Sequence, residues 1–280
     1  MTSPKEVYEG SNRFALDGRV AVVTGACGLL GQQFSLALLD AGAHVVVADV
    51  NHEQAAAFAA ELSTRARGRA IAVQLDVTSP SSIEACKEET LRQFDRVDVL
   101  VNSAAINDRF DEGQAASQSR FETYSLEHWQ KQLEVNLTGS FLTCQILGAE
   151  MARQGRGSIV NIGSTYGLVA PVQDIYRRPD GAQMFFKSAG YAASKGGVVM
   201  LTRFVATYWA SCGVRANVIC PGGVAQQQEP HFVQQYAART PLGRMAEPHE
   251  IAGAAVFLAS DAASYVTGAV FSVDGGWTAW

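Results

Sequence analysis

The chain has 280 residues, of which 48% are hydrophobic and 18% are charged, and its net charge is −5. This composition supports a sizeable apolar core and excludes an intrinsically disordered chain. The acidic balance argues against nucleic acids or anionic membranes as partners. No apolar run approaches the roughly 18 residues that a membrane-spanning helix needs.

The first ten residues are polar and acidic and do not resemble a signal peptide, so we expect a cytoplasmic protein. The five cysteines are scattered without a zinc-type or redox-type pair, which predicts reduced thiols. The five histidines are equally dispersed, so no metal site is expected.

Apolar runs alternate with stretches of helical spacing along most of the chain. The predicted strands lie at residues 20–24, 45–48, 71–77, 97–101, 157–162, 214–220 and 269–273. The predicted helices include residues 32–41, which end before Gly42, residues 53–67, which end before Gly68, and a helix that a Ser81–Glu84 capping box opens and that runs to Phe94.

Strands alternating with helices predict a single α/β domain over residues 15–280, with a doubly wound parallel seven-stranded sheet, after an N-terminal extension at 1–14. Two stretches, 106–125 and 165–190, are longer and more polar than the other connections. Long loops in compact α/β domains are usually functional, and ligands bind beyond the carboxyl ends of the strands. We therefore expect both loops to lie beside a ligand.

A glycine-rich turn follows the first predicted strand and precedes a helix. Gly25 permits a tight turn, Gly28 lets the backbone approach a pyrophosphate, and Gly31 lets the helix pack against the strand. Asp49 ends the second strand, where a carboxylate accepts hydrogen bonds from adenosine ribose hydroxyls and repels a 2′-phosphate. No Arg or Lys follows Asp49 directly, so NAD is favoured over NADP. The alternative is a glycine turn that binds nothing.

Tyr191 and Lys195 are four residues apart, which places a phenol and an ammonium on one face of a helix. A tyrosine pKa of about 10 must fall by about 3 units before the phenol acts as a base near neutrality. A neighbouring cation and the positive charge of a nicotinamide have that effect. Taken alone, the pair could equally be a helix-surface pair.

The motifs together resemble the short-chain dehydrogenase/reductase family from about residue 17 to the end. They are TGACGLLG at 24–31, Asp49, Asp76-Val77, NSAA at 102–105, VNLTG at 135–139, SIVNIGS at 158–164, YAASK at 191–195, ICPGG at 219–223 and VDGGW at 273–277. The resemblance implies a single-domain Rossmann fold and an NAD-dependent oxidoreductase that acts on a secondary alcohol or ketone.

The resemblance also implies roles for individual residues. Tyr191 would be the general acid/base, Lys195 would lower its pKa and bind the ribose, Ser164 would bind the reacting oxygen, and Asn136 would hold a relay water. The cofactor-binding residues would be Gly25, Cys27, Gly28, Leu30, Gly31, Asp49, Val50, Asp76, Val77, Asn102, Ala104, Tyr191, Lys195, Pro221, Gly222 and Val224.

The chain departs from the family pattern at several places. Gly28 stands one position earlier than the usual middle glycine, and NSAA replaces the commoner NNAG. An insertion separates Ser164 from Tyr191. The usual threonine after Pro221 is missing, since Val224-Ala225 follow, which puts a contact to the carboxamide in doubt.

The insertion carries Tyr176, Arg177, Arg178 and Lys187, which we expect close to where a substrate enters. They suggest a polar substrate such as a sugar, sugar acid or polyol, as in a sugar-metabolising branch of the family that includes flagellin-modification dehydrogenases. The alternative is a solvated surface loop. By resemblance, residues 225–245 form a third, substrate-covering loop that offers Gln226, Gln227, Gln228, Glu229 and His231.

Relatives are commonly tetramers or dimers, so we expect a homo-oligomer. Trp277 and Trp280 are expected in a subunit interface rather than a binding site, and the stripe Val198, Leu201, Val205, Tyr208, Trp209 in the core or an interface. Two other functions stay open: a reductase of β-ketoacyl or steroid-like hydrophobic ketones, and a non-catalytic NAD-binding protein.

Overall fold

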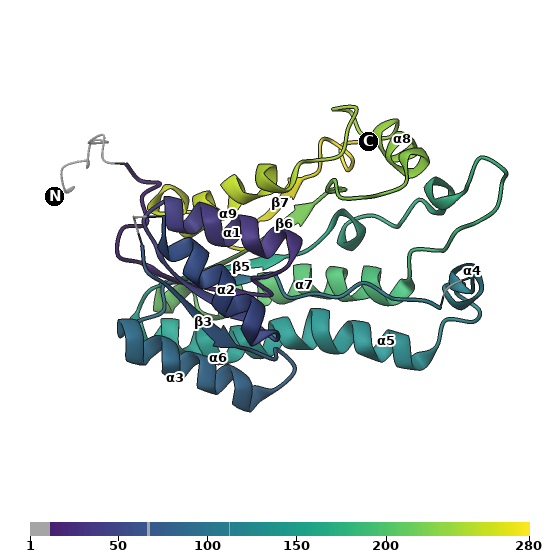
Figure 1. Ribbon diagram of the computed structural model, residues 1–280. Coiled ribbons are helices and arrows are strands. Elements are labelled where there is room, and N and C mark those ends of the chain that lie inside the picture. Colours follow the sequence, from purple (N-terminus) through teal and green to yellow (C-terminus); the bar gives the residue numbers. More distant parts are fainter. Residues whose placement is uncertain (1–11, 66–67, 112) are drawn as a thin grey trace.

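The computed structural model describes residues 12–65, 68–111 and 113–280, so most of the expected N-terminal extension lies outside the described residues. Seven parallel strands form one sheet in the order β3-β2-β1-β4-β5-β6-β7. Helices cover both faces of this sheet (Figure 1). The predicted doubly wound seven-stranded α/β fold is therefore confirmed.

The strands are β1 Val20–Thr24, β2 His44–Asp49, β3 Ala70–Gln74, β4 Val99–Asn102, β5 Gly157–Ile162, β6 Val214–Pro221 and β7 Val270–Val273. The α-helices are α1 Leu29–Asp40, α2 His52–Ser63, α3 Pro80–Phe94, α4 Ala115–Gln118, α5 Leu126–Leu133, α6 Gly139–Gln154, α7 Ala189–Tyr208, α8 Pro230–Ala237 and α9 Ala252–Ala259. A π-helical turn, η1 Glu134–Thr138, joins α5 to α6.

The core has one apolar layer on each face of the sheet. Alternate residues of β1 point to opposite layers: Ala21 and Val23 pack with α1, α2 and α9, whereas Val20 and Val22 pack with α3, α6 and α7. A strand buried on both faces has no polar alternation, which explains why β1 is a continuous apolar run.

Two predicted helix starts are wrong by a few residues. Helix α1 begins at Leu29 rather than at residue 32, directly after Gly28. Helix α3 begins at Pro80, and its N-cap is Ser79, whose hydroxyl accepts a hydrogen bond from the Ser82 N–H at 3.3 Å. Proline fits the first position of a helix, because the N–H group at that position has no partner within the helix and is not missed. The N-cap is therefore Ser79, two residues before Ser81.

The carboxyl ends of the strands carry the longest connections. The segments that contain α4 and α8 project beyond this end, on the side opposite to the start of the described chain (Figure 1). Strands β1 and β4 are neighbours although β2 and β3 lie between them in sequence, and the connections diverge at such a point and leave a crevice. No helix in the described part of the chain is long and apolar enough to cross a membrane.

Candidate functional site

A cavity of about 820 Å³ opens at the carboxyl ends of β1, β2, β4 and β5. Its lining includes sixteen of the residues predicted from the sequence: Gly25, Cys27, Gly28, Leu30, Gly31, Asp49, Val50, Asp76, Val77, Ala104, Ser164, Tyr191, Lys195, Pro221, Gly222 and Val224. The predicted cofactor residues and the predicted acid/base pair therefore share one cavity, which we call the cofactor cleft.

The glycine-rich turn is packed too closely to accept side chains at Gly25 and Gly31. A Cβ on Gly25 would lie 2.6 Å from the Ala104 Cα, and one on Gly31 would lie 2.1 Å from the Gly25 carbonyl oxygen. No side chain caps the start of α1. The N–H groups of a first helical turn have no partner within the helix and attract anions. The turn and the start of α1 therefore fit the pyrophosphate of a dinucleotide.

Asp49 fixes the adenosine end of the cleft. Its Oδ2 accepts a hydrogen bond from the Cys27 N–H at 3.0 Å, and its Oδ1 accepts one from the Asn51 N–H at 3.1 Å. Burial and the Asp49 carboxylate raise the pKa of the Cys27 thiol to about 11, so the thiol stays neutral. Both carboxylate oxygens of Asp49 are thus held by main-chain N–H groups at the end of β2, on the lining of the cleft.

Lys131 is a cofactor-cleft residue that the sequence argument missed. It lines the cleft, lowers the pKa of Asp76 together with hydrogen bonds from Thr78, and forms an ion pair with Glu134 at 2.9 Å. Helix α5 brings it there from a distant part of the sequence, and no motif marks it.

Tyr191 and Ser164 meet where β5 ends and α7 begins. Gly167 allows this approach, since a Cβ there would lie 2.7 Å from the Lys195 main chain. The Ser164 Oγ accepts a hydrogen bond from the Tyr166 N–H at 3.1 Å, so its own proton remains free to donate. Burial raises the pKa of Tyr191, an interaction with Ser164 lowers it, and Cys220 raises it.

Lys195 is 4% exposed and lies one helical turn after Tyr191. Its Nζ donates a hydrogen bond to the Ile162 carbonyl at 2.8 Å and lies 5.9 Å from the centre of the Tyr191 ring. Burial lowers the pKa of Lys195 to about 8. An ammonium has three donors, so two remain for groups in the cleft.

Asn136 lies in the π-helical turn and is completely buried, behind the cleft rather than in its lining. Its Oδ1 accepts from the Ile106 N–H at 2.8 Å, and its Nδ2 donates to the Ile106 carbonyl at 3.1 Å and to Gln132 Oε1 at 2.8 Å. The side chain is thus committed to holding the start of the 106–125 segment, and no direct hydrogen bond joins it to Lys195 in the described structure.

Asn102 also lies behind the cleft. Its Nδ2 donates to Asn161 Oδ1 at 2.8 Å, and its Oδ1 accepts from the Thr143 hydroxyl at 2.7 Å. These bonds tie the ends of β4 and β5 to α6. The side chain therefore supports the floor of the cleft, and Asn102 is not among the residues that line it.

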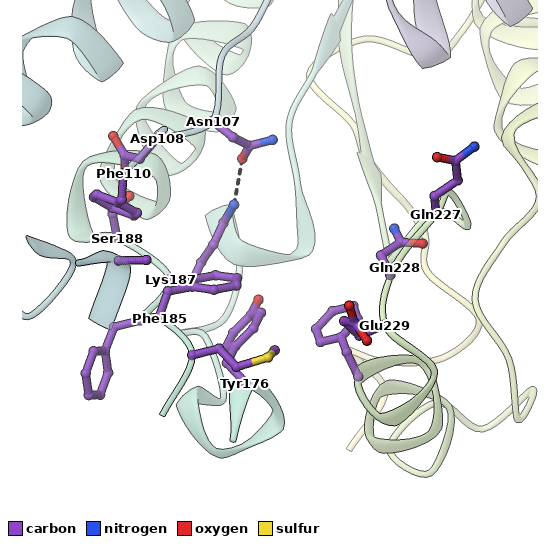
Figure 2. Close-up of a pocket in the computed structure, with 14 residues that line it drawn as sticks. Asn107, Asp108, Phe110, Tyr176, Phe185, Lys187, Ser188, Gln227, Gln228 and Glu229 are labelled. Carbon is purple, nitrogen blue, oxygen red and sulfur yellow. Dashed lines mark hydrogen bonds between the residues drawn. The ribbon is translucent and has the colours of Figure 1, made fainter. Parts of the chain in front are cut away.

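A second cavity of about 530 Å³ adjoins the cofactor cleft, and we call it the substrate pocket. All three predicted substrate loops contribute to it: Asn107 and Asp108 from the first, Lys187 from the second and Glu229 from the third. Asn107, Asp108 and Lys187 lie across the pocket from Gln227, Gln228 and Glu229 (Figure 2). The two cavities share Asn107 and Gln228.

One side of the substrate pocket is apolar, which the polar sequence of the insertion did not predict. The lining includes Phe110, Tyr176, Met184, Phe185, Phe186 and Phe232. Tyr176 stacks on Phe232 with ring centres 5.3 Å apart. Its hydroxyl shares a hydrogen bond with that of Tyr166 at 3.2 Å. Tyr176 and Lys187 of the insertion therefore form part of the pocket wall, whereas Arg177 and Arg178 are exposed and do not line the pocket.

Trp277 and Trp280 have different surroundings. Trp277 is 6% exposed and stacks on Tyr236, with ring centres 4.2 Å apart. Trp280 is 82% exposed. Trp277 thus belongs to the core of its own chain beneath α8, so its expected place in a subunit interface is wrong.

All five cysteines lie in the described residues and are free. Within residues 12–65, 68–111 and 113–280, no group of three or more His, Cys, Asp or Glu side chains could hold a metal ion.

Comparison with known proteins places this geometry in a family. A sequence profile of the family described as enoyl-(acyl carrier protein) reductase matches residues 25–278. D-threitol dehydrogenase from Mycolicibacterium smegmatis is 37% identical over 270 residues, 95% of each chain. The 3-alpha-(or 20-beta)-hydroxysteroid dehydrogenase from Mycobacterium bovis is 38% identical over 261 residues, 93% of this chain and 90% of that one.

One solved structure is similar to this chain in both fold and sequence. A gluconate 5-dehydrogenase from Burkholderia cenocepacia J2315, in complex with NADP and tartrate, is 32% identical to this chain. It matches with a TM-score of 0.83, over 96% of this chain and 98% of that one. The chain therefore belongs to the short-chain dehydrogenase/reductase family of oxidoreductases.

Proposed function

We propose that the chain is an NAD(H)-dependent dehydrogenase of a polyol, sugar or sugar acid, with Tyr191 as its acid/base. The observation that carries this proposal is that the cofactor cleft, which Tyr191 lines, adjoins the substrate pocket at Asn107 and Gln228. The cofactor cleft contains Tyr191, and Lys187 of the substrate pocket lies over the Tyr191 ring. A substrate hydroxyl in the pocket can thus reach the phenol and the cofactor cleft together.

Each residue of the site has its own role in this proposal. Bound nicotinamide would accept the hydride from the carbinol carbon. Tyr191 Oη takes the hydroxyl proton of the alcohol, and Ser164 donates its free proton to hold the same oxygen. Lys195 stabilises the phenolate and offers its two remaining donors to the ribose hydroxyls of the cofactor. Asn136 supports the wall of the site through Ile106.

The cofactor preference rests on Asp49. The ribose hydroxyls of NAD would donate hydrogen bonds to its carboxylate, whereas the 2′-phosphate of NADP would meet a negative charge there. The relative in complex with NADP shows that the family also uses the other cofactor, so the preference needs its own test.

We expect Asp49→Asn to weaken NAD binding about tenfold and to reduce the discrimination against NADP about a hundredfold, since it removes one charged partner and one repulsion. Glu53→Gln is the matched control, because Glu53 lies exposed in the first turn of α2 and does not line the cleft. The measurement is the ratio of kcat/KM for the two cofactors. An unchanged ratio in Asp49→Asn contradicts the assignment.

The polar side of the substrate pocket favours a substrate with several hydroxyl groups. Asn107, Asp108, Gln227, Gln228 and Glu229 offer amide and carboxylate groups that suit such a molecule. Relatives named for D-threitol and gluconate support this substrate class. The aromatic side is compatible with it, since sugar rings and chains also expose apolar C–H faces.

The same aromatic side favours a second candidate, a dehydrogenase of bulky hydrophobic alcohols, and a relative named for hydroxysteroids supports it. NADH formation on polyols, aldonic acids and hydroxysteroids separates the two. Turnover concentrated on polyols or sugar acids supports the first candidate, and turnover confined to hydroxysteroids supports the second.

We also propose that the chain forms a homo-oligomer through α6 and α7. Phe141, Met200, Phe204 and Tyr208 are each 44–65% exposed on these two helices, and Phe204 stacks on Tyr208. Large apolar side chains grouped on a surface mark interaction sites. Sedimentation of Phe204→Glu beside the unaltered chain tests this, with a smaller assembly expected for the variant.

A further inference from the structure

The insertion places a second lysine against the acid/base tyrosine. The Lys187 Nζ lies over the face of the Tyr191 ring, 3.7 Å from its centre, whereas the Lys195 Nζ lies 5.9 Å from the same point. A cation over an aromatic face is attracted by the ring electrons, and a cation beside a phenol stabilises its ionised form. Of the two ammonium groups, that of Lys187 is thus the nearer to the centre of the Tyr191 ring.

The position of Lys187 is built by contacts at both ends of the residue. Gln173 holds its main chain from both sides: the Lys187 N–H donates to Gln173 Oε1 at 2.8 Å, and Gln173 Nε2 donates to the Lys187 carbonyl at 2.9 Å. The Nζ donates to Asn107 Oδ1 at 2.6 Å, as Figure 2 shows. Two loops therefore fix the ammonium over the ring.

The charged groups around Lys187 leave its charge available to Tyr191. Asp108 accepts hydrogen bonds from Tyr124 and Gln132, and no ion pair joins Asp108 or Glu229 to Lys187 in the described part of the chain. Burial lowers the pKa of Lys187 to about 8, and Asp108 opposes this. Besides Asp108, the titratable groups that face Tyr191 or Lys187 are Lys195, Cys220, Tyr166 and Tyr176.

We propose that Lys187 is a second cation of the active site, which stabilises the phenolate of Tyr191 together with Lys195. The inference rests on the proposed role of Tyr191 and adds a positioning residue supplied by the insertion. Because the alcohol gives its proton to the Tyr191 phenolate, oxidation rises with pH as the phenol ionises. Loss of the Lys187 charge would move this rise to higher pH.

The test compares Lys187→Met, which removes the charge, with Lys187→Arg, which keeps a cation. Arg178→Met is the matched control, since Arg178 is an exposed cation of the same insertion. In Lys187→Met the acidic limb of kcat/KM for alcohol oxidation should move up by about one pH unit. In Lys187→Arg and Arg178→Met the limb should stay in place. A limb that stays in place in Lys187→Met, with activity reduced equally at every pH, overturns the proposal.

A second measurement does not need turnover. In protein carrying ¹³Cζ-tyrosine with NAD bound, the Tyr191 resonance is the one lost in Tyr191→Phe, and its titration midpoint should rise by about one unit in Lys187→Met. An unmoved midpoint overturns the inference even if the enzyme is active. Failure to bind NAD or to oxidise any alcohol would instead refute the proposed function, so the two failures are distinguishable.

Discussion

Two glycines of the same turn should separate protein stability from cofactor binding. A Cβ added at Gly31 would lie 2.1 Å from the Gly25 carbonyl oxygen and 2.8 Å from the Ala26 Cα. A Cβ added at Gly28 would meet only the Gly25 oxygen, at 3.3 Å. Gly31→Ala must therefore push α1 away from the turn, whereas Gly28→Ala fits with a small adjustment.

The expected cost follows from this geometry. The atoms that oppose the new methyl group at Gly31 belong to the backbone, so the helix itself has to move by about 1 Å. Overpacking of this kind costs about 3 kcal/mol, which corresponds to a melting temperature lower by about 6 °C in a chain of this size. For Gly28→Ala we expect a loss of stability below about 0.5 kcal/mol, because Gly28 has an ordinary extended backbone with φ −75° and ψ 169°.

The assay is thermal and urea unfolding of both variants without cofactor, followed by titration with NADH. Gly28→Ala places a methyl group where the pyrophosphate would approach, so it should weaken NADH binding about tenfold or more while the protein stays folded. Gly31→Ala should lower both stability and binding. A stable Gly31→Ala variant, or a Gly28→Ala variant that binds NADH as the unaltered chain does, would refute this account of the turn.

Two further changes test the energetics of the fold. Among the described residues, the Ser35 hydroxyl is buried in α1 without a hydrogen-bond partner, so Ser35→Ala should raise the free energy of unfolding by about 1 kcal/mol in urea titrations; a loss of stability would show that the hydroxyl has a partner. The pKa of Lys195 is lowered to about 8 from 10.5, so the unfolded chain holds this proton more tightly, and stability should rise between about pH 8 and 10.5. Lys195→Met should lose up to about 3 kcal/mol of this rise, and equal pH dependence in both proteins would contradict the burial of the charge.

The sheet could be predicted almost completely from the sequence, because strands buried on both faces are continuous apolar runs. β5 was predicted at its observed bounds. The errors fell at helix starts, where local contacts decide. Helix α3 begins at Pro80 with Ser79 as its N-cap, and α1 begins at Leu29 with Gly28 as its N-cap.

The site could be predicted where its residues lie in local motifs, and not where distant loops meet. Tyr191 and Lys195 are one helical turn apart, so their spacing predicted that they share one face of a helix, and both lie on α7 in the lining of the cleft. Lys131, and the position of Lys187 over Tyr191, depend on contacts between segments far apart in the chain. The same is true of Asn136, whose bonds to Ile106 and Gln132 follow from the π-helical turn between α5 and α6.

The most direct test of the central claim is a comparison of Tyr191→Phe with the unaltered chain, with alcohol oxidation and NADH binding measured on the same preparations. The phenyl ring keeps the packing and removes only the proton-transferring oxygen. The account predicts that kcat falls at least about a thousandfold, within the range for loss of a general base, while the NADH dissociation constant changes less than about threefold. Retention of most of the turnover in Tyr191→Phe would contradict the claim that this phenol is the acid/base.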